Sequence, residues 1–401
     1  MKLTVRIFLF LILGMALLIG LNWQKINRLM TVNSLFDADN IVENFSNMDT
    51  AFLHQDLERG DTPFVWPEDI QPLPEAVTVA GKEENLSDLL ETLDTTALVV
   101  IKDGTLIHES YYRGTEKDDL RISWSVAKSF MSGLYGSALE SGEIQSLDDP
   151  VTQYVPALKG IAYDGASLRN VLNMASGVRF NEDYLDPQSD ISKMGRVIGL
   201  GGSMDEFVET LTERQYEPGT HMQYVSIDTH VAAMALRRAT GKTLHQLFNE
   251  TYGAHLGFGK SPYYITDGED VAFALGGLNL RTRDYAKFGE LFRLKGLWQG
   301  KQVIPAEWTT QSIRHSAPTM SERGVGYGYQ WWVPMPQDGV HAGDFFGVGI
   351  YGQYVYVNPS HGIVIAKNAA DREFLEPQAG YLTSMGVNID MFRSLAEQLG
   401  Q

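Results

Sequence analysis

Two strand–turn–strand patterns near opposite ends of the chain constrain its fold more than any other feature of the sequence. Each consists of two short runs of mostly apolar residues, at Ala97–Ile101 and Thr105–Tyr112 and at Tyr351–Val357 and Gly362–Lys367. The residues that separate the runs, Lys102-Asp103-Gly104 and Asn358-Pro359, are typical of turns. Between the two patterns, residues 125–315 are rich in helical periodicity. We therefore expect an α+β domain whose sheet joins both ends of the chain around a helical middle.

The first residues indicate a membrane anchor or an export signal. Lys2 and Arg6 precede the almost uninterrupted apolar run Ile7–Leu21, and Trp23 follows it. This stretch is close to the lower limit for a helix that crosses a bilayer, roughly 17 residues. No small-residue cleavage pattern follows the run, which favours an uncleaved anchor over a cleaved signal, although both interpretations stay open. Under either interpretation the rest of the chain lies outside the cytoplasm.

The remaining chain divides into a connector and one large domain. We expect the anchor or signal in residues 1–30, an extended connector in residues 31–85 and a single domain in residues 86–401. The connector lacks strong periodicity, and prolines interrupt it. The domain is long enough to bury a sizeable apolar core.

The composition excludes several classes of function. The chain has 32 Lys and Arg against 50 Asp and Glu, a net charge of −18, and no basic cluster, so nucleic acid is not expected as a partner. The absence of cysteine excludes a thiol nucleophile, a disulfide framework and a cysteine-based metal site. The nine histidines are scattered and form no H-E-x-x-H pattern. We therefore expect neither a metal nor an organic cofactor.

A serine and a lysine at the predicted start of a helix are the first candidates for chemistry. Ser125 begins the segment Ser125-Val126-Ala127-Lys128, and apolar pairs then repeat every four residues. Lys128 is three residues on and lies on the same face of the first helical turn. A partly desolvated lysine can take the proton of a serine hydroxyl, and the free N–H groups of the turn can stabilise an oxyanion. An isolated S-x-x-K tetrapeptide is also common as an ordinary helix cap, so it cannot be accepted on its own.

The residues around this motif resemble the serine β-lactamase and penicillin-binding-protein superfamily. The resemblance lies in an ordered set of segments, Ser125–Phe130, Leu147–Val151, Val171–Gly177 and Tyr327–Trp332. Within the superfamily, Phe180–Tyr184 and Gly349–Gln353 make the chain most similar to the 6-aminohexanoate-dimer hydrolase and esterase-like branch. The resemblance implies a β-lactamase/transpeptidase-like fold, in which an antiparallel sheet is flanked by helices and a mainly helical insertion. It also implies that Ser125 is a nucleophile activated by Lys128.

A tyrosine element of the superfamily also has a counterpart. Tyr224-Val225-Ser226 matches its Y-x-N or Y-x-S pattern, just before a predicted helix. The resemblance implies that Tyr224 shares proton transfer with the lysine and that Ser226 contacts the substrate. A half-buried aromatic ahead of a helix is the simpler interpretation of Tyr224 taken alone.

A third element, K-T-G in lactamases, is assigned to Gly347-Val348-Gly349. In this assignment Gly349 lies against the substrate, and the N–H of Ile350 joins that of Ser125 in an oxyanion hole. His341-Ala342-Gly343 is a rival placement, and a plain turn before an edge strand is the simpler interpretation. The K-T-G lysine is missing, which predicts poor recognition of the carboxylate on penicillin-like substrates.

The combined motifs predict a serine hydrolase that forms an acyl-enzyme on Ser125 and acts on a small amide, ester or peptide-like substrate. Tyr184 resembles the tyrosine that contacts the substrate amide in the amidohydrolase branch, although it could equally be a loop aromatic over the pocket. The alternatives are a penicillin-interacting peptidase or β-lactamase and a non-catalytic binding or sensor module of the same fold. The expected location is the bacterial inner membrane with the catalytic domain outside the cytoplasm, or secretion if residues 1–23 are cleaved.

Overall fold

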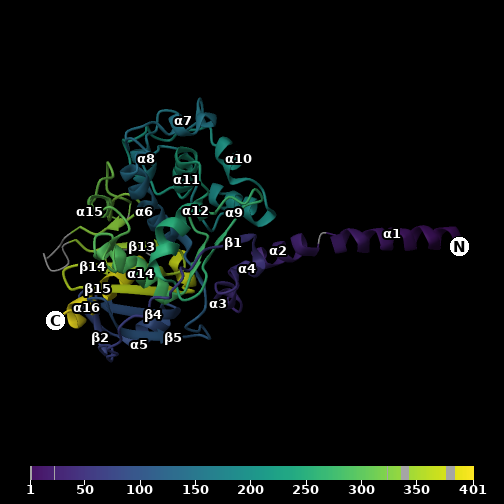
Figure 1. Cartoon of the computed structure of the whole chain (residues 1–401). Helices are drawn as coiled ribbons and strands as arrows, with labels where there is room; N and C mark the ends of the chain where they lie inside the picture. Colours follow the sequence, from purple (N-terminus) through teal and green to yellow (C-terminus); the bar gives the residue numbers. More distant parts are fainter. Residues whose placement is uncertain (1, 22, 323, 336–342, 376–383) are drawn as a thin grey trace.

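A seven-stranded antiparallel sheet forms the centre of the protein (Figure 1). The computed structural model describes residues 2–21, 23–322, 324–335, 343–375 and 384–401. In the order in which they pair, the strands are β11 (Gly326–Tyr327), β12 (Trp332–Val333), β13 (Phe345–Gly349), β14 (Gln353–Asn358), β15 (Ile363–Ala369), β4 (Thr95–Lys102) and β5 (Thr105–Tyr111). Strand β15 pairs with β4, with Ile365 opposite Val100. The predicted sheet that joins both ends of the chain is therefore confirmed.

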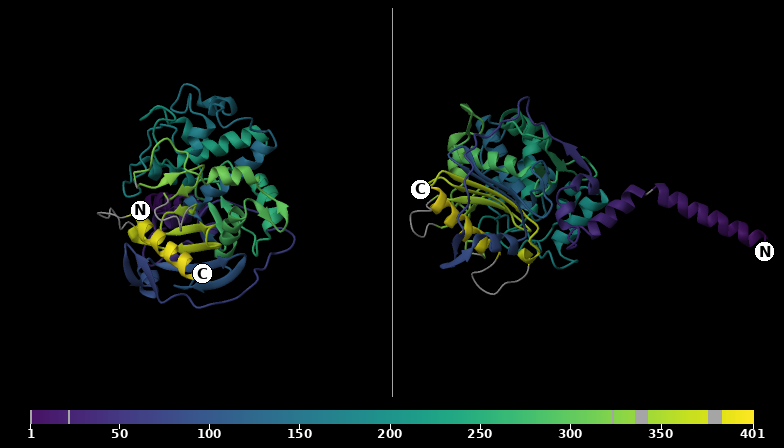
Figure 2. Two further views of the ribbon diagram at one scale, coloured as in Figure 1. Left: turned by 90° about the vertical axis from the view of Figure 1, so that its left-hand side faces the viewer. Right: turned by 90° about the horizontal axis from the view of Figure 1, so that it is seen from below.

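Alternate residues of the sheet pack into two different apolar cores, as the period of two in a strand requires. In β4, Val99 and Ile101 belong to the larger core, whereas Leu98 and Val100 belong to the smaller one. Figure 2 shows helices on both faces of the sheet. The larger core contains residues of α6 (Ala127–Glu140) and α14 (Thr282–Arg293), and the smaller core contains residues of α5 (Leu86–Thr92) and α16 (Ser384–Leu399). A hairpin of β2 (Ala76–Val79) and β3 (Lys82–Asn85) packs beside α16.

The helical middle of the chain lies between β5 and β11. Besides α6 and α14 it contains α7 (Val151–Tyr154), α8 (Leu168–Leu172), α9 (Asp190–Leu200), α10 (Met204–Glu209), α11 (Ile227–Thr240), α12 (Leu244–Phe248), α13 (Ala254–Leu256) and α15 (Ala306–Ser312). A second, four-stranded sheet pairs in the order β1 (His54–Asp56), β7 (Tyr263–Ile265), β8 (Leu278–Leu280) and β6 (Arg121–Ile122), and β9 (Leu297–Trp298) pairs with β10 (Lys301–Gln302). The α+β architecture with a mainly helical insertion is confirmed.

The N-terminal residues form two helices, α1 (Lys2–Leu21) and α2 (Trp23–Asn33). Helix α1 points away from the rest of the protein (Figures 1 and 2). Among the described residues, no helix meets both the length and the hydropathy that crossing a membrane requires. The predictions of a transmembrane anchor, of the membrane as a partner and of an inner-membrane location are therefore wrong.

The predicted connector contains regular structure and buried side chains. Its first half forms α3 (Ile41–Asn44) and α4 (Met48–Ala51), and its strand β1 pairs with β7. Phe45 and Met48 are fully buried in the larger core. The boundaries at residues 30 and 85 stay predictions.

Candidate active site

Ser125 and Lys128 lie side by side at the start of the helix that the sequence predicts. Ser125 belongs to the 3-10 turn η1 (Trp124–Val126), which leads directly into α6. The Nζ of Lys128 donates a hydrogen bond of 2.7 Å to the Oγ of Ser125. It donates two more, of 3.1 Å to the Oγ of Ser226 and 3.0 Å to the backbone oxygen of Leu275. An ammonium has three N–H donors, so each one has a partner here.

Burial changes the acid–base behaviour of Lys128. The side chain is only 1% exposed, and this desolvation lowers the pKa of its amine to about 7, although the nearby Glu182 carboxylate opposes the shift. Near neutral pH a substantial fraction of the amine is therefore uncharged. An uncharged amine 2.7 Å from a hydroxyl oxygen is within reach to accept its proton.

Glu182 is a central residue of the site that sequence reasoning did not single out. Its Oε2 accepts a 2.8 Å hydrogen bond from the backbone N–H of Ser226, and its Oε1 accepts bonds from the Ser226 hydroxyl and, at 3.0 Å, from the Tyr184 hydroxyl. Burial raises the pKa of this carboxyl group, against the lowering effect of Lys128. Glu182 thus connects Ser226, Tyr184 and the electrostatic environment of the lysine. In the sequence it is one acid in a polar segment, which is typical of a solvated loop.

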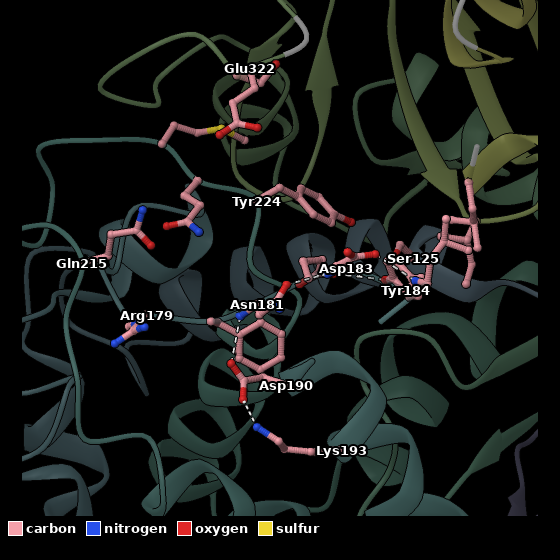
Figure 3. A pocket seen from close by; sticks show the side chains of 18 of the residues that line it. Ser125, Arg179, Asn181, Asp183, Tyr184, Asp190, Lys193, Gln215, Tyr224 and Glu322 are labelled. Carbon is pink, nitrogen blue, oxygen red and sulfur yellow. Dashed lines mark hydrogen bonds and ion pairs between the residues drawn. The ribbon is translucent and has the colours of Figure 1, made fainter. Parts of the chain in front are cut away.

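Tyr224 lies close to Lys128, three residues before α11. Its ring stacks on Trp332 with the centroids 5.3 Å apart, and the Nζ of Lys128 lies 5.3 Å from its centroid. Figure 3 shows the Tyr224 hydroxyl directed toward the end of the pocket where Ser125 and Tyr184 lie. A phenol in this position can share proton transfer with the lysine.

The glycines of the third predicted element let strand β13 approach the serine turn closely. A Cβ added at Gly349 would lie 2.4 Å from the backbone oxygen of Ser123 and 3.0 Å from the backbone nitrogen of Ser125. A Cβ at Gly347 would lie 2.8 Å from the Oγ of Ser129. Ile350 follows directly and lines the pocket together with Ser125. Among the described residues, none accepts a hydrogen bond from the Ile350 N–H, so this donor is available to a ligand.

We expect Gly349→Ala to destabilise the protein, because the added methyl group meets backbone atoms that cannot move aside easily. The free energy of unfolding should fall by about 1–3 kcal/mol, measured by denaturant titration. Gly195→Ala in α9 is the matched control, since a Cβ there has no neighbour within 4 Å and alanine favours a helix. Equal stability of the two variants would contradict the close approach of β13.

The rival third element cannot be compared in the same way. His341 and Ala342 lie outside the described residues, and Gly343 is the last member of that segment. Gly347-Val348-Gly349 is therefore the candidate whose position is known, on β13 beside the serine turn.

A single cavity of about 1120 Å³ contains most of the predicted site residues. Its wall includes Ser125, Tyr184, Tyr224, Gly349 and Ile350. Lys128 and Ser226 lie beneath this wall, buried and bonded to each other. The structure therefore brings all the predicted site residues together.

The charge of the cavity wall is predominantly negative. One of its basic residues, Arg179, forms an ion pair with Glu213 at 2.5 Å. The other, Lys193, forms an ion pair with Asp190 at 2.9 Å (Figure 3). Three further acids of the wall, Glu182, Asp183 and Glu322, have no ion-pair partner among the described residues. Among the described residues of the wall, both basic side chains are paired, so neither is free to bind a substrate carboxylate. Over the described ranges, no group of three or more His, Asp or Glu side chains is arranged to hold a metal ion.

Comparison with known proteins supports the resemblance seen in the sequence. The Beta-lactamase family model matches residues 84–377. The 6-aminohexanoate-dimer hydrolase of Paenarthrobacter ureafaciens is 30% identical over 310 residues, which cover 74% of this chain and 78% of that protein. Both likenesses place the chain among proteins named as hydrolases.

Solved structures show the same fold. A putative 6-aminohexanoate-dimer hydrolase from Bacillus anthracis superposes with a TM-score of 0.79 at 24% identity, covering 91% of this chain and 96% of that one. A D-stereospecific amidohydrolase from Streptomyces sp. gives a TM-score of 0.56 at 18% identity, with 77% and 99% covered. The predicted β-lactamase/transpeptidase-like fold is confirmed.

Proposed function

The chain belongs to the Beta-lactamase family, and from this premise we propose that it is a serine hydrolase that forms an acyl-enzyme on Ser125. The observation that carries the proposal is the 2.7 Å contact between the Ser125 hydroxyl and a buried lysine whose pKa is lowered to about 7. A weak nucleophile and a base of suitable pKa are thus in hydrogen-bonding contact within a substrate-sized cavity. The substrate is a small amide, ester or peptide-like molecule.

The proposed reaction has two acyl-transfer steps. In the first, the Oγ of Ser125 attacks the substrate carbonyl carbon while uncharged Lys128 takes the hydroxyl proton. The N–H groups of Ser125 and Ile350 hold the oxyanion. As this intermediate collapses, the bond between the carbonyl carbon and the leaving amine or alcohol breaks, and Tyr224 relays the proton from Lys128 to the leaving group. In the second, water attacks the acyl-enzyme and gives up a proton to the same groups. The acid product leaves, and Ser125 regains its proton.

The acidic wall of the cavity supports a neutral or cationic substrate rather than an anionic one. The basic residues of the wall are already paired, whereas Asp183 and Glu322 have no ion-pair partner in the part of the chain that the structure describes. A substrate carboxylate would therefore meet repulsion without a compensating ion pair. This argues against a β-lactamase or a penicillin-interacting peptidase, both of which bind substrates with a carboxylate. A linear amide with a free amine fits the charge better. The dimer in the name of the relative from Paenarthrobacter ureafaciens has such an amine, but it also has a terminal carboxylate, so only its amine end matches this wall.

A covalent probe and a substrate panel test the proposed function. A fluorophosphonate should label the folded protein, and mass mapping should locate the adduct on Ser125. Among nitrocefin, a D-Ala-D-Ala peptide, a p-nitrophenyl ester and a linear amide with a free amine, the last two should be hydrolysed fastest. Absence of a Ser125 adduct would contradict the mechanism and favour a binding module, and preferred turnover of nitrocefin would contradict the proposed substrate class.

We expect Glu182→Gln to shift the pH profile of the reaction toward acid. The Glu182 carboxylate raises the pKa of Lys128, so its loss lowers that pKa further and moves the acid limb of kcat/KM below pH 7. In the glutamine, an NH2 group that cannot accept replaces one carboxylate oxygen. Either the Ser226 N–H or the Ser226 and Tyr184 hydroxyls therefore lose their acceptor, which should lower kcat about tenfold. Glu217→Gln is the control, because this exposed carboxylate does not line the cavity and has no hydrogen bond to Lys128, Ser226 or Tyr184 in the described structure. An unchanged acid limb in Glu182→Gln would contradict the assignment.

A further inference from the structure

The N-terminal segment carries aromatic side chains that pack against both sides of the proposed oxyanion hole. We propose that Phe36 and Phe45 are positioning residues, which hold the backbone on either side of the N–H donors of Ser125 and Ile350. Both phenylalanines lie outside residues 84–377, the part matched by the family model. The inference rests on the proposed function, because it assigns a role toward the oxyanion of that reaction.

Four aromatic rings form one cluster, which we call the aromatic clamp: Phe36, Phe45, Trp124 and Tyr351. Phe36 stacks on Tyr351 with the centroids 4.9 Å apart and the rings 18° from parallel, and it lies 5.9 Å from Trp124. Phe45 contacts the same two rings edge-on, at 5.6 Å from Trp124 and 5.5 Å from Tyr351. The N-terminal segment therefore bridges two parts of the chain that are more than two hundred residues apart.

Two members of the clamp, Trp124 and Tyr351, are sequence neighbours of the residues that provide the oxyanion donors. Trp124 directly precedes Ser125, and Tyr351 directly follows Ile350. Both have left-handed backbone conformations, with φ of +40° at Trp124 and +60° at Tyr351. Bulky side chains rarely adopt this conformation, and it persists only where the surroundings hold it in place. Phe36 and Phe45 contact both side chains and can hold these two backbone conformations in place.

Three hydrogen bonds fix the segment that carries Phe45 relative to the serine turn. The N–H of Ile122, three residues before Ser125, donates a 3.0 Å bond to the backbone oxygen of Phe45. The buried Arg121 guanidinium donates from Nη1 to the backbone oxygen of Val42 and to the Oγ of Ser46, both at 2.7 Å. The segment that carries Phe45 is thus attached to the strand that leads into the nucleophile.

The phenylalanines act through their neighbours, because neither of them lines the cavity described above. Phe45 is fully buried, so its removal would disturb the core as well as the clamp. Phe36 is 38% exposed, and its truncation leaves the core nearly intact. Phe36 is therefore the residue whose replacement tests the proposal.

The test compares Phe36→Ala with Phe64→Ala in the full chain. Phe64 is the matched control, since it also belongs to the N-terminal part and packs on core aromatics, at 5.1 Å from Trp66 and 4.9 Å from Trp298, but contacts no residue of the site. Phe36→Ala should lower kcat about tenfold with KM changed by less than about twofold, because misplaced donors weaken the transition state and not the bound substrate. The rate of fluorophosphonate labelling on Ser125 should fall by a similar factor, because the phosphoryl oxygen occupies the same hole.

Two further variants keep the result independent of folding. Phe36→Tyr preserves the stacked ring and should restore kcat, whereas Phe36→Leu preserves the apolar contact without the stack and should remain impaired. The inference would be overturned by equal kcat in Phe36→Ala and Phe64→Ala, or by full activity of Phe36→Leu. The proposed function would still be supported in that case if the wild type is labelled on Ser125. A wild type that neither labels nor hydrolyses any substrate would overturn both.

Discussion

Ser125→Ala is expected to lower kcat/KM by about 10⁴-fold or more while leaving the protein folded. The hydroxyl of Ser125 is the atom that forms the acyl-enzyme, and removing it leaves only the oxyanion donors and substrate binding. Labelling by a fluorophosphonate should disappear in the same variant. The measurements are steady-state kinetics on the preferred ester or amide and mass mapping of the probe.

Ser132→Ala is the matched control for this variant. Ser132 is a buried serine on α6, seven residues after Ser125, and its hydroxyl has no hydrogen-bond partner among the described residues. Its replacement removes the same kind of hydroxyl from the helix that follows the serine turn, so kcat/KM and labelling should stay unchanged. Full activity of Ser125→Ala would contradict the proposed serine mechanism, whatever the activity of Ser132→Ala.

Local patterns in the sequence were sufficient to predict the two hairpins that form β4, β5, β14 and β15 of the sheet, and the nucleophile helix. Turn residues separate the apolar runs of β4 and β5 and those of β14 and β15, so the pairing within each hairpin follows from short-range signals. The pairing of β15 with β4 does not, because the two strands are far apart in the sequence. Ser125 and Lys128 are three residues apart in one helical turn, which fixes their proximity without any tertiary information. The resemblance to the family supplied the order of the more distant elements.

The contacts that complete the site depend on tertiary structure and could not be predicted in this way. Glu182 reaches Ser226 across 44 residues, and Lys128 reaches the backbone oxygen of Leu275 across 147. A carboxylate in a polar loop and a carbonyl in an apolar one carry no local signal of these contacts. The clamp contact between Phe36 and Tyr351 is of the same kind, because nothing in residues 31–85 indicates which surface they cover. The prediction of a transmembrane anchor was wrong for a related reason, because it rested on the apolar composition of the N-terminal run alone.

Lys128→Met is expected to lower kcat/KM by about 10³-fold at pH 8 and to abolish the acid limb of its pH profile. In the wild type, the base form of an amine with a pKa of about 7 accumulates as pH rises, so kcat/KM should increase through pH 7 and then level off. Methionine has nearly the same length but cannot accept the proton of Ser125. Combining Ser125→Ala with Lys128→Met should cost no more than Ser125→Ala alone, because the two residues act in one step.

Lys367→Met serves as the control for removing a buried amine. Lys367 on β15 is also nearly inaccessible, and burial lowers its pKa to about 8, but it does not line the cavity. We expect this variant to keep both the rate and the acid limb of the wild type. A wild-type profile that lacks an inflection near pH 7, or a Lys128→Met variant that retains it, would contradict the role of Lys128 as the base.

The same buried amine should make the difference in stability between the wild type and Lys128→Met depend on pH. Its pKa is about 7 in the folded protein and near the ordinary 10.5 in the unfolded chain, so the unfolded state binds more protons between these values. The stability of the wild type therefore includes a cost that is complete below pH 7 and vanishes as pH rises to 10.5. Methionine removes this cost but leaves the Ser226 hydroxyl and the Leu275 carbonyl without a donor, a loss that is independent of pH. The difference in free energy of unfolding, Lys128→Met minus wild type, should therefore fall steadily from pH 7 to pH 10. A constant difference over that range would contradict a buried, partly uncharged lysine, on which the proposed mechanism depends.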